Sequence, residues 1–169
     1  MDDRFVDVIQ LIKQSRFNAI KAVNSELIHL YWNIGEYISK KIENSEWGAS
    51  VVDELAKFIQ KNEPALKGFS NKNIWRMRQF YETYKRFPKL SPVVREISWT
   101  NNMLLFSRCK SIEEIEFYLQ LTRRENYSKR ELDRQISASL FERSMMIKSI
   151  NNQGKQLPSN ELTDTFKDD

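Results

Sequence analysis

The chain has 169 residues, of which 40% are hydrophobic and 30% charged, which is enough for one domain with a buried core. Its single cysteine and single histidine exclude an internal disulfide and a zinc site of the usual composition. The net charge of +4 is basic, but it is too small to establish nucleic-acid binding by itself.

Apolar residues recur at helical spacing through the first part of the chain and predict two helices, over residues 3–13 and 15–42. Gly35 interrupts the second helix, which indicates that a neighbouring element approaches closely there. We expect this helix to bury Leu30, Ile34 and Ile38. Its apolar stripe consists of Ala19, Val23, Leu27, Leu30, Ile34, Ile38 and Ile42.

Serines mark the starts of the helices that follow. Ser50, Ser70, Ser111 and Ser128 each precede a run at helical spacing, as N-cap residues do. A carboxylate follows three residues after the first, third and fourth of these serines, as in a capping box. We expect Thr100 to cap a further short helix.

The rest of the chain completes an all-α fold class. Two prolines predict a loop after residue 87, and residues 92–98 form either a short strand, as a minor β wing, or a helical turn. The last long helix is expected over residues 129–147. Residues 1–150 then form one helical domain, and the polar residues 151–169 are expected to be a flexible tail.

A helix-turn-helix pattern occurs twice in this arrangement. The first unit joins a helix over residues 51–60 to the run NKNIWRMRQFYETY at 71–84 through a long connection. The second unit joins residues 112–126 to the helix that follows Ser128 through a turn short enough for a helix-turn-helix motif.

The helix after Ser70 combines an apolar side with a basic side. One side carries Ile74, Met77, Phe80, Tyr81 and Tyr84, which predicts that most of its aromatic residues belong to the core. The opposite side has no acidic residue within it and is typical either of a solvated face or of a DNA contact. This basic stripe consists of Lys72, Arg76, Gln79 and Arg86.

Two further features allow a contact with a partner. Trp75 lies on the border between the two sides, where it either packs on a neighbouring helix or meets a partner. A second basic group consists of Arg123, Arg124, Lys129, Arg130 and Arg134, of which the last three are the candidate DNA contacts. Acidic residues interleave with this group, so ion pairs within the helix are an alternative to DNA binding.

The residues give no sign of an enzyme. His29 stands among core-like residues, no histidine is near Cys109 in the sequence, and no phosphate-binding glycine loop or metal-binding carboxylate pair is visible. We therefore expect no cofactor and no metal. No apolar stretch approaches the ~20 residues of a membrane helix, and a signal-peptide pattern is missing, so we expect a cytoplasmic protein without a membrane partner.

Several stretches in the same order resemble the N-terminal domain of the YhcG-like family of bacterial proteins. They are LYWNIGEYI, EWGASVVDELAKFI, GFSNKNIWRMRQFYETY, ISWTNNMLL and YSKRELDRQI, and the resemblance extends to about Arg143. The chain departs from the family at Thr100 and Asn101, where glycine and histidine are common, and at Asn126 and Tyr127, where glycine and tryptophan are common.

The resemblance implies a helical, helix-turn-helix module that precedes a C-terminal nuclease domain of the PD-(D/E)XK type, whose catalytic residues would lie after residue 169. Together with the residues, it leads us to expect a non-catalytic module that binds duplex DNA for a tethered or partner nuclease. A protein-interaction or homodimerisation module, with the 15–42 helix and Trp75 in the contact, is the alternative. A small nuclease acting alone is the third hypothesis.

Overall fold

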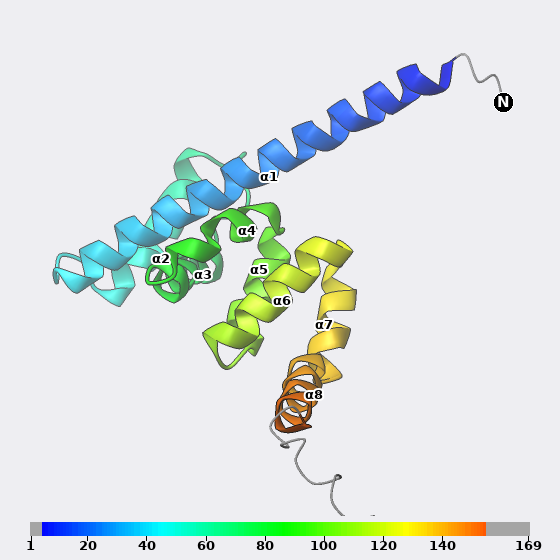
Figure 1. Cartoon of the computed structure of the whole chain (residues 1–169). Coiled ribbons are helices and arrows are strands. Elements are labelled where there is room, and N and C mark those ends of the chain that lie inside the picture. Colours follow the sequence, from blue (N-terminus) through cyan, green and yellow to red (C-terminus); the bar gives the residue numbers. More distant parts are fainter. Residues whose placement is uncertain (1–4, 155–169) are drawn as a thin grey trace, which may run out of the picture.

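The computed structural model in Figure 1 describes residues 5–154. Over this range the chain forms eight α-helices and the short 3-10 turn η2, with no strand, so the expected all-α class is confirmed. The elements are α1 (Val6–Glu43), α2 (Ala49–Asn62), α3 (Asn71–Tyr84), η2 (Pro88–Leu90), α4 (Ser91–Glu96), α5 (Trp99–Arg108), α6 (Ile112–Glu125), α7 (Lys129–Ser137) and α8 (Leu140–Gly154).

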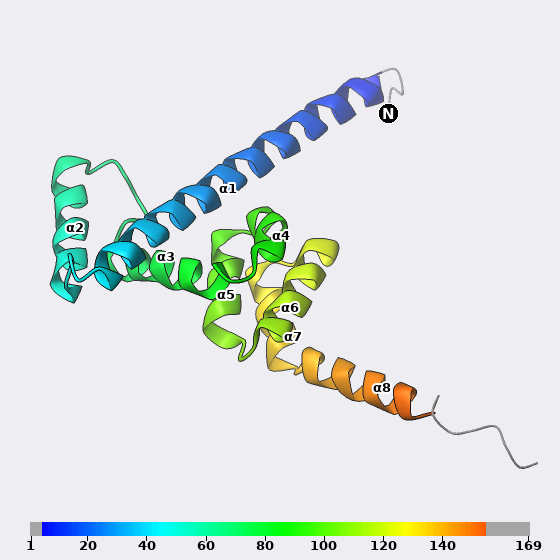
Figure 2. The same ribbon diagram turned by 60° about the vertical axis from the view of Figure 1, so that its left-hand side comes forward.

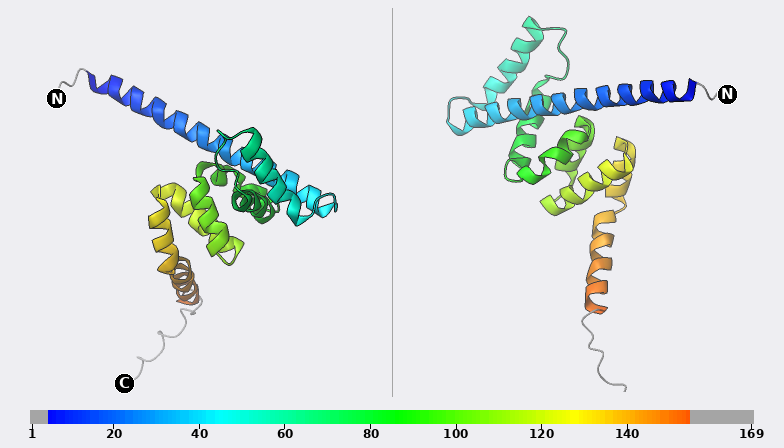
Figure 3. Two further views of the ribbon diagram at one scale, coloured as in Figure 1. Left: turned by 180° about the vertical axis from the view of Figure 1, so that it is seen from behind. Right: turned by 45° about the horizontal axis from the view of Figure 1, so that its top comes forward.

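The helices enclose two hydrophobic clusters. A smaller cluster lies where α1, α2 and α3 meet, around Ile38, Val52 and Ile74. A larger cluster extends from α3 through α7, with Phe80 and Tyr118 fully buried. The N-terminal half of α1 extends away from this body, and α8 does so after its first residues, Leu140 and Phe141, which pack on the larger cluster (Figures 2 and 3).

Residues 6–43 form one continuous helix instead of the two that we expected. Neither glycine nor proline stands between residues 13 and 15, so nothing interrupts the helix there. The close approach at Gly35 is confirmed, because a Cβ atom built on it would lie 2.1 Å from the backbone oxygen of Met77 in α3. Ile38 is buried as expected, but Ile34 is only half-buried and Leu30 is exposed.

Three of the predicted N-caps are confirmed. The hydroxyls of Ser70, Ser111 and Ser128 accept hydrogen bonds from the amides three residues later, at 3.2 to 3.3 Å. Ser128 and Glu131 form the full capping box.

The other two expected N-caps are wrong. Gly48 instead of Ser50 precedes α2, so Ser50 lies inside the helix. Ser98 instead of Thr100 caps α5, and its hydroxyl accepts from the amide of Asn101 at 3.1 Å. In both places the helix begins two residues before the point that the sequence pattern indicated.

Residues 91–96 form helix α4, so the strand alternative for residues 92–98 is wrong. Pro92 stands in the first turn, where its missing amide costs no hydrogen bond and its ring favours the helical φ angle. The carbonyls at the end of this helix are satisfied by the buried amide of Asn102, which donates to Val94 at 3.1 Å and to Ile97 at 3.1 Å.

The expected helix over residues 129–147 is two helices. Ser139 adopts a left-handed conformation with φ of 53°, which ends α7 and redirects the chain into α8. The Phe141 amide in the first turn of α8 donates to the Tyr118 hydroxyl at 3.2 Å, and this bond fixes the new direction. Helix α8 continues to Gly154, so residues 151–154 are not a tail, and the remaining residues of the expected tail lie outside the described range.

Candidate nucleic-acid interface

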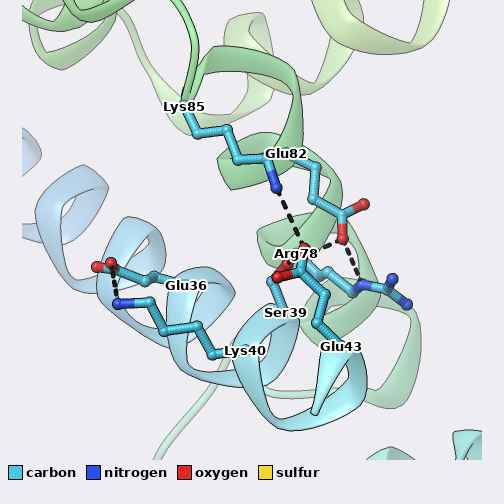
Figure 4. Close-up of polar contacts among 7 residues, drawn as sticks. All are labelled: Glu36, Ser39, Lys40, Glu43, Arg78, Glu82 and Lys85. Atoms are coloured by element: carbon cyan, nitrogen blue, oxygen red, sulfur yellow. Dashed lines mark hydrogen bonds and ion pairs between the residues drawn. The ribbon is translucent and has the colours of Figure 1, made fainter. Parts of the chain in front are cut away.

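The polar residues of α3 lie on two sides, and on one of them the charges are paired. Arg78 donates to Glu82 at 2.8 Å, and the same carboxylate accepts from the buried Ser39 hydroxyl of α1 at 3.0 Å. Lys85 pairs with Glu43 of α1 at 3.2 Å. Figure 4 shows these side chains bridging α1 and α3. On this side the cations of α3 are therefore neutralised by carboxylates.

The basic stripe of α3 lies on the other side and is not neutralised. Lys72 and Gln79 on α3 are exposed, as is Arg86 just after the helix. Arg76 is half-buried, and its guanidinium reaches the sulfur of Met103 in α5 at 3.5 Å. Within residues 5–154 no carboxylate forms an ion pair with Lys72, Arg76 or Arg86.

Trp75 lies between these two sides and packs against the smaller hydrophobic cluster. It is half-buried, and the Arg78 guanidinium lies 5.3 Å from the centre of its ring. Both contacts are internal to the domain. The structure therefore shows the packing role that we considered for Trp75, and its contact with a partner stays a prediction.

The predicted DNA-binding residues of the second basic group lie on α7 and are exposed. Lys129 and Arg130 are the first two residues of this helix, and Arg134 stands about one turn later. One expected intrahelical ion pair of this group is present in α6, between Arg124 and Glu125, whereas the carboxylates of α7 form no ion pair with the three cations of that helix. Glu131 instead accepts from the Ser128 amide and hydroxyl, both at 3.0 Å, and these bonds lower the pKa of the Glu131 carboxyl.

The other carboxylate of α7 also points elsewhere. Asp133 pairs with Arg108 at the end of α5, and the same guanidinium donates to the Ser137 hydroxyl at 3.2 Å. These contacts fix α7 against α5 while Leu132 and Ile136 enter the core. Asp133 stands among the cations of α7, and Arg108 lies 25 residues before it in the chain. Nothing in the sequence indicated that these two residues would form an ion pair.

Helix α5 connects the two basic groups. It contacts α3 through the Trp99 indole, which donates to Asn73 at 3.0 Å, as well as through Met103 beneath Arg76. It contacts α7 through Arg108, and it contacts the connection before α7 through Asn101, whose side-chain amide donates to the Tyr127 carbonyl at 2.9 Å. The predicted basic residues of α3 and α7 are thus carried by helices that flank a common neighbour.

The connections within the two predicted helix-turn-helix units differ. Helices α2 and α3 are separated by residues 63–70, and α1 packs along α3 at Gly35. Helices α6 and α7 are separated by only three residues, of which Asn126 is left-handed with φ of 54°. The second unit is closer to a DNA-binding motif, in which residues at the start of the second helix reach the bases.

The described residues offer little for catalysis. No group of three or more histidine, cysteine or acidic side chains within residues 5–154 could hold a metal ion. Burial raises the pKa of Cys109 to about 12, so its thiol is a poor nucleophile at neutral pH. The Nδ1 atom of His29 lies 3.1 Å from the Arg95 guanidinium, which is an interaction between α1 and α4. Among the described helices, none is long and apolar enough to cross a membrane.

The DUF1016 N-terminal domain family matches residues 7–143, from the first turn of α1 into α8. The chain belongs to this family. No curated protein and no solved structure gave a match. The match covers both basic groups of this DUF1016 N-terminal domain and both predicted helix-turn-helix units.

Proposed function

We propose that this DUF1016 N-terminal domain is a non-catalytic module that binds duplex DNA. The observation that carries the proposal is the contrast between paired and unpaired cations. Lys40, Arg78 and Lys85 each have a carboxylate partner, whereas the cations of the α3 stripe and of α7 have none among the described residues. Unpaired lysine and arginine side chains on one body suit the phosphates of a duplex.

The two groups suit different parts of a duplex. Lys129 and Arg130 stand at the start of the second helix of the shorter helix-turn-helix unit, which is where base contacts are made in such motifs. The α3 stripe, with its half-buried Arg76, suits contacts with the phosphate backbone.

The bound DNA would serve a nuclease of the PD-(D/E)XK type, either tethered to this domain or supplied by a partner protein. This part of the proposal is supported by the resemblance of the sequence to the YhcG-like proteins and by the family match. A cytoplasmic location follows from the same assignment. Because the described residues hold no metal-binding group, the domain alone is expected to leave plasmid DNA uncut in the presence of Mg²⁺. Magnesium-dependent cutting would contradict the non-catalytic role.

The DNA proposal is tested by fluorescence anisotropy with a labelled duplex at several salt concentrations. We expect the Lys72→Ala and Arg76→Ala double variant to bind more weakly, and the slope of log affinity against log salt to fall by about 2 because two phosphate contacts are lost. The Arg130→Ala and Arg134→Ala double variant should also bind more weakly, because its cations belong to the helix that makes base contacts.

The matched control removes two cations from the paired side, with Lys40→Ala and Lys85→Ala together. This variant has the same net charge as the two test variants, but its lysines are engaged by Glu36 and Glu43. Its salt slope should stay close to that of the wild type. An equal loss in all three variants would show that only overall charge matters, and a wild type that never binds the duplex would overturn the proposal.

A further inference from the structure

Helix α1 carries an apolar stripe that nothing in the described structure covers. At 100° per residue its members lie within about 40° of one line along the helix. Ile20 and Val23 are each 70% exposed, and Leu30 is 44% exposed. The stripe consists of Ile9, Ile12, Ile20, Val23, Leu27 and Leu30, with Arg16 as the one charged residue on the same line.

This apolar stripe is separate from the side of α1 that packs on the body. The packing side is formed by Ile28, Tyr31, Gly35 and Ile38, all buried, and it is rotated by about 80° from the stripe. Leu27 and Leu30 therefore remain exposed even where α1 crosses the other helices. Figures 2 and 3 show the N-terminal half of α1 projecting beyond the other helices, and the stripe residues from Ile9 to Val23 belong to this half.

The projecting half needs a partner on physical grounds. A helical segment that packs on nothing is marginal in water, because most helix stability in proteins comes from burying an apolar face. The stripe covers 22 residues, about three heptads, which is long enough for a two-helix coiled coil.

The stripe residues of one copy can lie opposite the stripe residues of a second, antiparallel copy. When two copies of α1 lie antiparallel, Ile9 faces Leu30, Ile12 faces Leu27 and Arg16 faces Val23, and the numbers in each pair add up to 39. Around the centre of this arrangement, Ile20 meets Ala19 and Ile20 of the second copy. Every large apolar residue of the stripe is then opposite another residue of the stripe or next to its centre.

The charges favour the same arrangement. Parallel copies in register would place Arg16 against Arg16 inside an apolar contact, which is repulsive. Antiparallel copies place Arg16 beside Val23 and within one turn of Glu26 of the second copy. Glu26 is exposed and forms no ion pair within residues 5–154.

We infer that two copies of this chain associate through the α1 stripe as an antiparallel helix pair. The inference does not depend on DNA binding, since none of the basic residues of α3 or α7 belongs to the stripe.

The first test is the mass of the full chain in solution, by sedimentation or by light scattering, over a wide range of concentration. We expect twice 20.2 kDa at high concentration. Ile20→Glu together with Val23→Glu should give a monomer that keeps the helical circular dichroism of the body. A monomeric wild type at every concentration would overturn the inference, and the stripe would then serve another partner or a lipid surface.

The matched control introduces the same two charges on the other side of α1, with Gln14→Glu and Asn18→Glu. Both residues are exposed and lie well away from the stripe, so this variant should remain a dimer. If it dissociated as the stripe variant does, a general effect of negative charge on α1 would explain the result and the stripe would not be the interface.

The second test is the orientation of the pair, by disulfide formation in a Cys109→Ala background. Ile12→Cys and Leu27→Cys proteins, mixed and then oxidised, should form the mixed disulfide because these positions face each other in the antiparallel pair. Ile12→Cys alone should form no disulfide-linked dimer. An efficient Ile12 homodimer would show a parallel pair, and a dimer without the mixed disulfide would show that another surface associates. Either result would overturn the inference.

Discussion

The two halves of α1 belong to one unbroken helix and are both rich in apolar residues, but they stand in different surroundings. In the C-terminal half, Ile28, Gly35 and Ile38 are buried against α3 and its neighbours. In the N-terminal half, Leu11, Ile12 and Ile20 are exposed. The difference teaches that helical periodicity shows where a helix is apolar, whereas only the approach of other elements decides which residues are covered.

The largest effect is expected at Gly35, where the covered half touches α3 most closely. Gly35→Ala should lower the free energy of unfolding by more than about 4 kcal/mol, because the added methyl would overlap the Met77 backbone and force the helices apart. Urea unfolding followed by tryptophan fluorescence measures this loss.

The control for Gly35 is Gly48→Ala, since a Cβ atom at Gly48 would meet nothing within 4 Å. This variant should lose at most about 1 kcal/mol, which is the preference for glycine over alanine at an N-cap. Equal losses at the two glycines would mean that the contact between α1 and α3 is looser than the structure shows.

A matched pair of truncations compares the halves directly. Ile38→Ala should cost about 2–5 kcal/mol because Ile38 is 0% exposed, and its loss leaves a cavity among the helices. Leu11→Ala should change the stability by less than about 0.5 kcal/mol because Leu11 is 71% exposed and lies off the apolar stripe. Both are measured by urea unfolding at one protein concentration, because association also changes apparent stability. Similar costs at the two sites would remove the distinction between the halves.

Among the changes at contacts between α1 and the body, the smallest effect is expected at Asn24, which marks the boundary between the halves. Its side-chain amide donates to the carbonyls of Arg95 and Ile97, at 3.0 Å and 3.2 Å. Asn24→Ala should cost about 1 kcal/mol, since Asn102 still satisfies the Ile97 carbonyl. Thermal unfolding checks this, with Asn18→Ala as a control on the exposed half that should leave the midpoint almost unchanged. If Asn24→Ala lost almost no free energy of unfolding, the half of α1 that is held by the body would begin after Asn24.

Sequence reasoning found the parts of the fold that depend on local chemistry. The caps at Ser70, Ser111 and Ser128 follow from hydroxyl bonds to amides three residues away, and the close contact at Gly35 follows from a glycine inside a helix. The break at Ser139 was missed because the apolar spacing continues from α7 into α8, and the new direction is held by a bond from the Phe141 amide to the distant Tyr118 hydroxyl.

The candidate site was predictable in its residues but not in its surroundings. The basic stripe of α3 and the cations of α7 were named from the sequence, and the structure places Lys72, Gln79, Arg86, Lys129, Arg130 and Arg134 at exposed positions. The sequence could not show that Asp133 is engaged by Arg108, because that pairing depends on how α5 and α7 pack. Nor could it show that Leu30 would stay exposed while Ile38 is buried. The Arg78–Glu82 pair, in contrast, joins residues four apart within α3, so it is local in the sequence.

Because α1 is one unbroken helix, the angle about the helix axis between its two apolar faces is fixed. Each residue added or removed between Val23 and Ile28 would turn the projecting stripe by about 100° relative to the body and shift it by about 1.5 Å. A change of one residue would point the stripe in a different direction, whereas a change of seven would restore its direction to within about 20°. Relatives that keep both faces should therefore differ in length within this helix by close to a whole number of helical turns, such as about 7 or about 11 residues.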